Sequence, residues 1–193
     1  MKVYFGPYKN YNKKTKTTPE RKISIKIDRF DTWSMDHTLA LIIHPMLVQL
    51  KATTRGAPST DDEDVPEKFR STKAKPKKNE WDTDSNHFKR WDWILDEMIW
   101  AFSQLIDEDA GDQFYSGKSQ LLWQALDKDG KPIGKPITSS SKKYNNNKDV
   151  KLYSMVKGPK DTFKVDRKSM DAWEKRKRNG FRLFGKYYQA LWD

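Results

Sequence analysis

Apolar side chains recur every three or four positions between residues 85 and 106, which predicts an α-helix with one apolar face. Trp93 and Trp100 extend the apolar surface onto a neighbouring face, and Asp92, Asp96 and Glu97 lie between the apolar positions. Because so much aromatic surface must be buried, we expect this helix to organise the core. Its main stripe consists of Phe88, Trp91, Leu95, Met98, Phe102 and Leu105.

Two further segments have the spacing of amphipathic helices. The first lies within residues 31–54 and contains Pro45, which we expect to kink or interrupt it. The second covers residues 166–193 and contains Gly180 and Gly185, which favour close packing against another helix. The apolar faces consist of Met35, Leu39, Ile42, Met46, Leu47 and Leu50 in the first helix and of Met170, Trp173, Phe181, Phe184, Tyr188 and Leu191 in the second.

Strand patterns occur in two other regions. Residues 21–30 have isoleucine at every second position, which predicts a half-buried strand that pairs with the N-terminal residues. In residues 113–165, the turn sequence Asp127–Gly130 separates two apolar runs and predicts a hairpin with an irregular second strand. The fold class is therefore α+β, with a three-helix core and a small antiparallel β-sheet or hairpins.

The length of 193 residues suits a single domain. Val65, Phe69 and Trp81 are the apolar residues that we expect to attach its long polar connection to the body. The expected order is N-terminal strands in residues 1–30, two helices in residues 31–112 with a long polar loop at 55–84, a β-rich insertion at 113–165, and a C-terminal helix at 166–193.

The net charge of +11 is unevenly distributed. Residues 1–29 carry a net +7 and residues 118–186 a net +12, whereas residues 81–112 carry a net −7. Part of this asymmetry fits an acidic central helix that faces a basic C-terminal helix, and the excess favours an anionic partner. The chain has no cysteine, which excludes disulfides and thiolate metal sites, and no apolar run long enough to span a membrane. We expect a cytoplasmic protein.

Tyrosines interleaved with lysines near the N-terminus are the best candidates for binding nucleic acid, because rings stack on bases while ammonium groups neutralise phosphates. In the C-terminal helix the cations at residues 175–178 are consecutive, so they spread around the helix and suggest general anion affinity rather than base recognition. The candidate anion-binding residues are Lys9, Lys13, Lys14, Lys16, Tyr8, Tyr11, Arg176 and Arg178.

Catalytic and cofactor signatures are lacking. The sequence has no HExxH motif, no nucleophile elbow and no Walker motif, so we expect no cofactor and a non-enzymatic role. One weaker alternative is a carboxylate–histidine metal site made by His37, Asp36, Asp96 and Glu97. Asp96 and Glu97 also suit a simpler role, in which they pair with Arg176, Arg178 or Arg182.

Four segments together resemble a widespread family of small uncharacterised proteins encoded by tailed bacteriophages. They are DTWSMDHTLALIIHPML at residues 31–47, DDEDVPEKFRST at 61–72, NEWDTDSNHFKRWDWILDEMIWAF at 79–102 and NGFRLFGKYYQALWD at 179–193. The resemblance implies expression in the cytoplasm of a bacterial host and a role in infection. It supplies no activity and no functional residues.

Three functions follow as hypotheses. The first is a bacteriophage accessory protein that binds an anionic partner in the host, either nucleic acid or a nucleotide-type ligand withheld from host defence. The second is a protein–protein inhibitor of a host enzyme, defence factor or transcription factor, acting through residues 55–84 or the acidic end of the central helix. The third is a metal-dependent hydrolase. The sequence leaves open the oligomeric state and whether the protein is packaged in the virion, where it would have a structural role.

Overall fold

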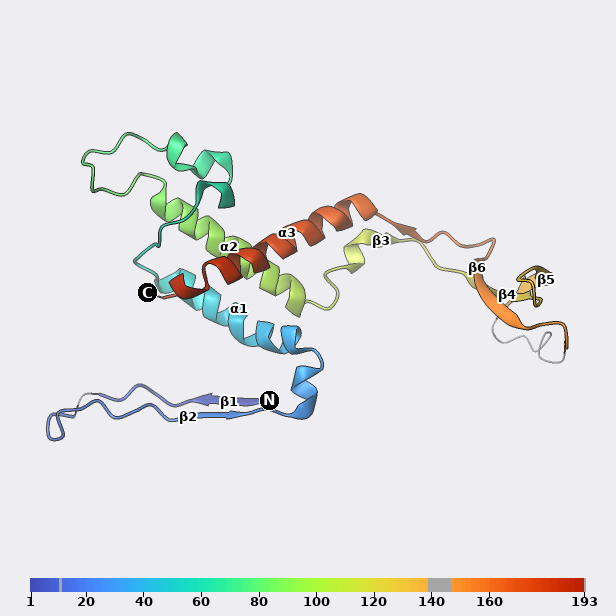
Figure 1. Cartoon of the computed structure of the whole chain (residues 1–193), viewed down its shortest axis with the longest axis horizontal. Coiled ribbons are helices and arrows are strands. Elements are labelled where there is room, and N and C mark those ends of the chain that lie inside the picture. The colour runs from blue at the N-terminus through green and yellow to red at the C-terminus, as the bar shows by residue number, and fades with distance from the viewer. Residues whose placement is uncertain (11, 139–146, 193) are drawn as a thin grey trace. The chain divides into compact units, whose positions relative to one another are not determined.

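The computed structural model describes residues 1–10, 12–138 and 147–192. The chain divides into two compact units, one formed by residues 1–107 with 176–193 and the other by residues 108–175 (Figure 1). The predicted α+β class is confirmed, with three α-helices and short antiparallel strands. The single domain expected from the sequence stays a prediction, and its β-rich insertion lies within the second unit.

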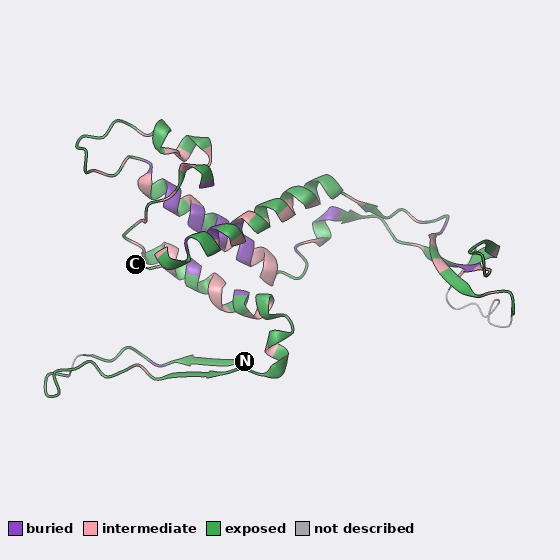
Figure 2. Ribbon diagram, viewed as in Figure 1, coloured by how far each residue is buried: buried purple, intermediate pink, exposed green. Residues whose placement is uncertain are grey.

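Helix α2 (His87–Ile106) is the centre of the first unit, as predicted. It packs against α1 (Met35–Thr53) and against the C-terminal half of α3 (Arg167–Lys186), so buried positions concentrate on it (Figure 2). Phe102 makes edge-to-face contacts with Phe181 and Phe184, with ring centroids 5.2 and 5.0 Å apart. The buried apolar residues of α2 are Trp91, Ile94, Leu95, Met98, Ala101 and Phe102.

The predicted apolar faces differ from the buried ones at several positions. Phe88 in α2 is exposed, and Ile94 and Ala101 are buried instead, because two helices pack against α2 and its buried face is wider than one stripe. Helix α1 buries only Ala40 and Leu47 completely, which lie seven residues apart on one side. The helix continues through Pro45, so no interruption occurs there. Three residues of its predicted face remain exposed, namely Met35, Leu39 and Met46.

Gly180 permits the close approach of α3 to α2, as the sequence suggested. A Cβ atom at this position would lie 2.4 Å from the Cβ of Ala101 and 2.6 Å from the carbonyl oxygen of Glu97. Gly185 on the same helix has no atom within 4 Å of the corresponding position. Of the two glycines in α3, Gly180 is therefore the one that the packing of α3 against α2 requires.

The polar connection at residues 55–84 is attached to the first unit by a buried carboxylate. The Asp64 side chain, only 3% exposed, accepts hydrogen bonds from Arg182, Lys186 and the hydroxyl of Tyr187. Val65 and Phe69 also join the core, whereas Trp81 is exposed, contrary to expectation. The connection contains the short 3₁₀ helices η2 (Asp62–Asp64), η3 (Glu67–Phe69) and η4 (Ser71–Lys73).

The second unit contains a three-stranded antiparallel sheet in the order β5-β4-β6 and a small β3–β7 ladder. The predicted turn at Asp127–Gly130 joins β4 to β5, and the register between these strands shifts between Trp123 and Ala125, which confirms the irregular hairpin. The Gln124 amide donates to the carbonyls of Ile133 and Gly134 at this irregularity. The elements are η5 (Asp112–Phe114), β3 (Tyr115–Ser116), β4 (Leu121–Leu126), β5 (Pro132–Ile137), β6 (Leu152–Lys157) and β7 (Lys164–Val165).

The N-terminal strands β1 (Lys2–Phe5) and β2 (Ile23–Lys26) form the expected antiparallel hairpin. The expectation that its isoleucines are half buried is wrong, because Ile23, Ile25 and Ile27 are each more than half exposed. Among the described residues these strands pair only with each other, and the short helix η1 (Arg29–Thr32) connects them to α1. Helix α3 is followed by η6 (Tyr188–Ala190).

The two glycines of α3 provide a matched test of the helix contact. Gly180→Ala should lower the free energy of unfolding by about 1–3 kcal/mol, because its methyl group would meet the backbone of α2 and force the helices apart. Gly185→Ala should raise it by up to about 1 kcal/mol, because alanine restricts the unfolded chain and meets nothing in the fold. Urea unfolding measures both, and a destabilising Gly185→Ala or a neutral Gly180→Ala would contradict the contact.

Asp64 should make the stability depend on pH. Burial would raise the pKa of Asp64, but hydrogen bonds from Lys186, Tyr187 and Arg182 outweigh it and hold this pKa below its ordinary value. The ionised carboxylate therefore stabilises the fold at neutral pH, and its contribution is lost as the pH falls through the lowered folded-state pKa. Asp64→Asn should cost about 1–3 kcal/mol at neutral pH and should flatten the loss of stability between about pH 5 and about pH 2.

The control is Asp61→Asn. Asp61 pairs with the same Lys186, but its side chain is 67% exposed, so its loss should cost less than about 1 kcal/mol. Urea unfolding across the pH range compares the two variants. Equal losses at neutral pH would show that the burial of Asp64 has no special effect.

Candidate anion-binding site

The candidate site is the N-terminal arm, which we define as the described residues among 1–27. In the ladder Lys2 is opposite Lys26 and Phe5 is opposite Ile23, and the N–H of Gly6 donates to the carbonyl of Lys22 at 2.8 Å. At its base the N-terminal ammonium group forms an ion pair with Asp31 at 2.7 Å.

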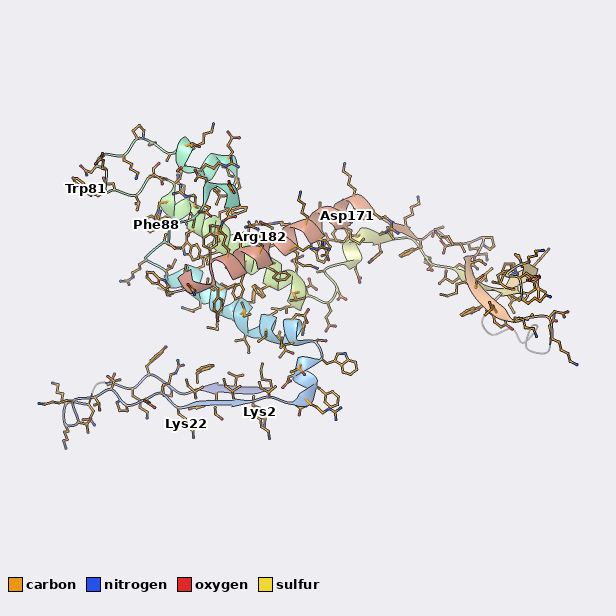
Figure 3. The ribbon with its side chains drawn as sticks, in the orientation of Figure 1. Lys2, Lys22, Trp81, Phe88, Asp171 and Arg182 are labelled. Carbon is orange, nitrogen blue, oxygen red and sulfur yellow. The ribbon has the colours of Figure 1, made fainter. Side chains whose placement is uncertain are left out.

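The register separates the side chains of the arm onto two faces. Because side chains alternate along a strand, Lys2, Tyr4, Ser24 and Lys26 share one face, and the apolar residues lie on the other. Lys2 and Lys22 lie along the same side of the arm in Figure 3. The arm thus has one basic face that carries a tyrosine. The opposite face carries Val3, Phe5, Ile23 and Ile25.

Tyr8 extends the aromatic character of the arm beyond the ladder. Its side chain is 84% exposed, and the guanidinium group of Arg21 lies 4.3 Å from its ring centroid. Arg21 also donates a hydrogen bond to the carbonyl of Gly6, which fixes the cation beside the ring. A positioned cation against an aromatic ring that remains exposed suits stacking on a base next to a phosphate.

Three predicted lysines lie in the turn at the end of the arm. Asn12 and Thr17 form an isolated β-bridge, and the Asn12 side chain accepts a hydrogen bond from the N–H of Lys14 at 3.0 Å. Lys16 has a φ of 53°, a left-handed conformation that costs about 1 kcal/mol or more for a residue with a Cβ atom. The turn therefore presents Lys13, Lys14 and Lys16 together.

The ammonium groups of these lysines are available to a partner. Lys9, Lys13, Lys14 and Lys16 are all exposed, and within the described residues none of their ammonium groups makes an ion pair or a hydrogen bond. The first nineteen residues contain no aspartate or glutamate. Tyr11, the remaining predicted arm residue, lies outside the described residues.

Arg176, another predicted anion-binding residue, pairs with a carboxylate of α2. Its guanidinium group donates to both oxygens of the Glu97 carboxylate, at 3.0 and 2.7 Å, and lies 3.9 Å from the ring of Trp100. The hydrogen bonds to Glu97 raise the pKa of Arg176 against the opposing effect of burial. Arg176 therefore neutralises a buried carboxylate of α2, as the alternative pairing suggested. Arg178 lies on an exposed part of α3.

The alternative metal site is not assembled. Asp96 forms an ion pair with Lys51, and Glu97 is held by Arg176, so His37 and Asp36 are not joined to them in a ligand set. Across residues 1–10, 12–138 and 147–192, no group of three or more His, Asp or Glu side chains is placed to hold a metal ion. The hydrolase hypothesis loses its proposed ligands.

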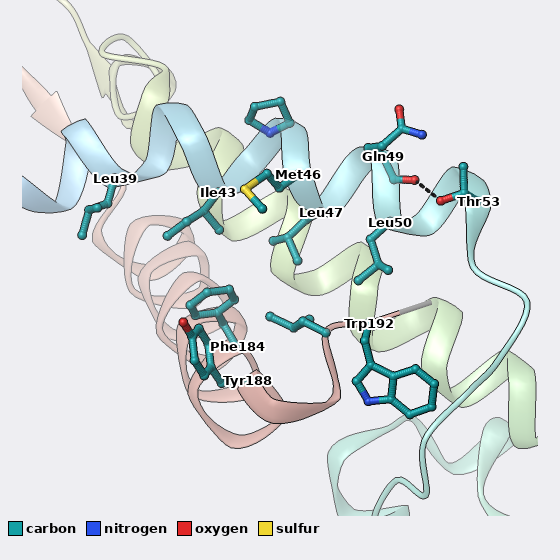
Figure 4. A pocket seen from close by; sticks show the side chains of 12 residues that line it. Leu39, Ile43, Met46, Leu47, Gln49, Leu50, Thr53, Phe184, Tyr188 and Trp192 are labelled. Carbon is teal, nitrogen blue, oxygen red and sulfur yellow. Dashed lines mark hydrogen bonds between the residues drawn. The ribbon is translucent and has the colours of Figure 1, made fainter. Parts of the chain in front are cut away.

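An apolar groove of about 1060 Å³, which the sequence did not predict, lies between α1 and residues 184–192. Met46 and Leu50 of α1 line it opposite Phe184, Tyr188 and Trp192 (Figure 4). The apolar residues of α1 predict burial in a core, and the helical spacing could not distinguish that from an open groove. Its signal in the sequence is that α1 has apolar residues on more than one face.

Comparison with family models, curated proteins and solved structures gives no match for this chain. The resemblance to a bacteriophage family therefore stays a prediction. No helix in the described part of the chain has the length and apolar character needed to cross a membrane.

Proposed function

We propose that the protein is a non-enzymatic binding protein whose N-terminal arm binds nucleic acid. The observation that carries this proposal is the contrast between two sets of cations. Arg90, Arg176, Arg182 and Lys186 each meet a carboxylate within the first unit. The arm lysines meet none among the described residues, so their charge remains available for phosphates.

The length of the arm favours a polymer over a free nucleotide. From Lys2 to Lys14 an extended chain covers up to about 40 Å, at roughly 3.3 Å for each residue. Cations spread over such a length can contact several successive phosphates, whereas a single nucleotide would meet only a few of them. We therefore favour nucleic acid over the nucleotide-type ligand. That this takes place in the cytoplasm of an infected bacterium remains part of the proposal.

The arm lysines can be tested by neutralising them together. The variant Lys9→Gln, Lys13→Gln, Lys14→Gln, Lys16→Asn should weaken oligonucleotide binding at low salt by at least about tenfold and reduce the salt slope of log K by about 3. Asparagine is chosen at position 16 because it tolerates a positive φ. Fluorescence anisotropy with labelled DNA and RNA in rising salt measures both quantities.

The matched control removes four exposed lysines from the second unit. The variant Lys128→Gln, Lys131→Gln, Lys151→Gln, Lys160→Gln has the same net charge as the arm variant. It should bind within about twofold of the wild type. Equal loss in the two variants would mean that total charge rather than the arm governs binding, and no binding by the wild type at low salt would reject the proposal.

The apolar groove favours a second candidate function, the inhibition of a host protein. A groove lined by leucine, methionine and aromatic residues suits the apolar face of an amphipathic helix. In this case a protein partner would bind the groove, and the complex would persist after nuclease treatment and at high salt.

A charge in the groove tests this second function. Met46→Asp should abolish capture of a stoichiometric protein partner from nuclease-treated bacterial lysate, because the carboxylate would be buried unpaired at the contact. Val48→Asp lies on the same helix outside the lining residues and should leave capture unchanged. Circular dichroism checks that both variants fold. Equal capture by Met46→Asp and the wild type would exclude the groove.

A further inference from the structure

The segment at residues 74–83, here called the lysine loop, is anchored at its base. Arg90 donates two hydrogen bonds to the Asp84 carboxylate, at 3.0 and 2.6 Å, and the N–H of Lys75 donates to the hydroxyl of Ser85 at 3.0 Å. The Asn86 amide donates to the carbonyls of Lys68 and Arg70. The loop therefore extends from a base that is attached to α2.

Trp81 lies at the outer edge of this loop (Figure 3). Its side chain is 85% exposed, and within the described residues its indole makes no ring contact and no hydrogen bond. The Asn79 amide donates to the Asp82 carboxylate at 3.0 Å, and the N–H of Asp82 donates to the carbonyl of Asn79 at 3.2 Å. This turn is local to the loop, and it leaves Trp81 outside the core that contains Trp91 and Phe102 of α2.

The lysine loop carries three lysines in addition to Trp81. Lys75, Lys77 and Lys78 are exposed, and in the part of the chain that the structure describes their ammonium groups make no ion pair. The loop also carries two carboxylates, of which Asp82 accepts the hydrogen bond from Asn79 and Glu80 is exposed. The loop thus repeats the combination found on the arm, where Tyr8 is 84% exposed beside Arg21 and near Lys9.

We infer that the lysine loop is a second contact for nucleic acid and that the ligand is single-stranded, with Trp81 stacked on an unpaired base. The inference rests on the proposed nucleic-acid binding. Within a duplex the faces of the bases are covered by their neighbours, so exposed rings beside lysines are useful only to bases that are free to stack. Apart from Trp81 the loop has only Ala74 and Pro76 as apolar residues, too few for insertion into a bilayer.

The experiment compares a labelled twenty-nucleotide oligo(dT) with a duplex of the same length. Wild-type protein should bind the single strand at least about tenfold more tightly. Trp81→Ala should weaken single-strand binding by roughly 5- to 150-fold, the range for loss of one stacked base. Trp81→Phe should retain most of the affinity, and duplex binding should be unchanged in both variants.

Trp33→Ala is the matched control. Trp33 is equally exposed, at 85%, but no lysine lies within three residues of it, so its loss should change affinity less than twofold. Equal effects of the two tryptophans, or equal affinity of wild type for single strand and duplex, would overturn the inference. If the arm variant loses binding while Trp81→Ala does not, the inference fails and the proposed function stands.

Vesicles of phosphatidylserine test whether the protein binds an anionic membrane surface instead of nucleic acid. Binding to these vesicles without binding to either oligonucleotide would overturn both proposals. The expected result is oligonucleotide binding that the vesicles do not compete away.

Discussion

The close approach of α3 to α2 at Gly180 is the constraint on which the first unit depends. Because glycine has no side chain, the backbones of α2 and α3 can approach closely at this position. Side chains on either side of the contact then reach from one helix to the other. One turn earlier Arg176 reaches the buried carboxylate of Glu97. Leu183 enters the core further along the helix, and Tyr187 enters it just after the helix ends. Tyr187 then donates to Asp64, which attaches the polar connection to the same helix. The close helix contact and these polar contacts therefore lie within one short stretch, residues 176–187.

These contacts distinguish charged side chains that are paired within the fold from charged side chains that remain available to a partner. Glu97 and Asp64 are buried carboxylates, and each needs a cation because an unpaired charge in the interior is costly. Arg176, Arg182 and Lys186 of α3 meet that need, so these three cations have a structural role that requires no ligand. The exposed lysines of the arm and of the lysine loop differ from these cations, because their ammonium groups pair with no carboxylate within the described residues. A large net charge by itself does not distinguish these two uses.

The N-terminal arm has few contacts that stabilise its fold. A two-stranded hairpin is only marginally stable in water, and here its isoleucines remain exposed. Its conformation is supported by the ion pair of the N-terminus with Asp31 and by the attachment of Arg21 to Gly6. Such an element gains stability when a partner covers it, which agrees with the role that we propose for it.

Periodicity and turn chemistry in the sequence determined the existence of three helices, the N-terminal hairpin and the Asp127–Gly130 hairpin, because these depend on residues close together in the chain. The central position of α2 was also predictable, since its aromatic and aliphatic residues recur at helical spacing along the whole segment and cover more than one face. The set of apolar residues that would be buried could not be predicted. Phe88 and Ile94 both lie at apolar positions of α2, and only the packing of the other helices decides which of them is covered.

The N-terminal lysines could be named as a candidate site from their spacing. Only the tertiary structure decided that Arg176 is paired, that His37 and Glu97 form no metal site, that α1 borders an open groove and that Trp81 lies in water. The pairing of Glu97 with Arg176 was one of several that the sequence allowed, and the structure selected it. The other features depend on how distant segments pack together, which local patterns do not determine.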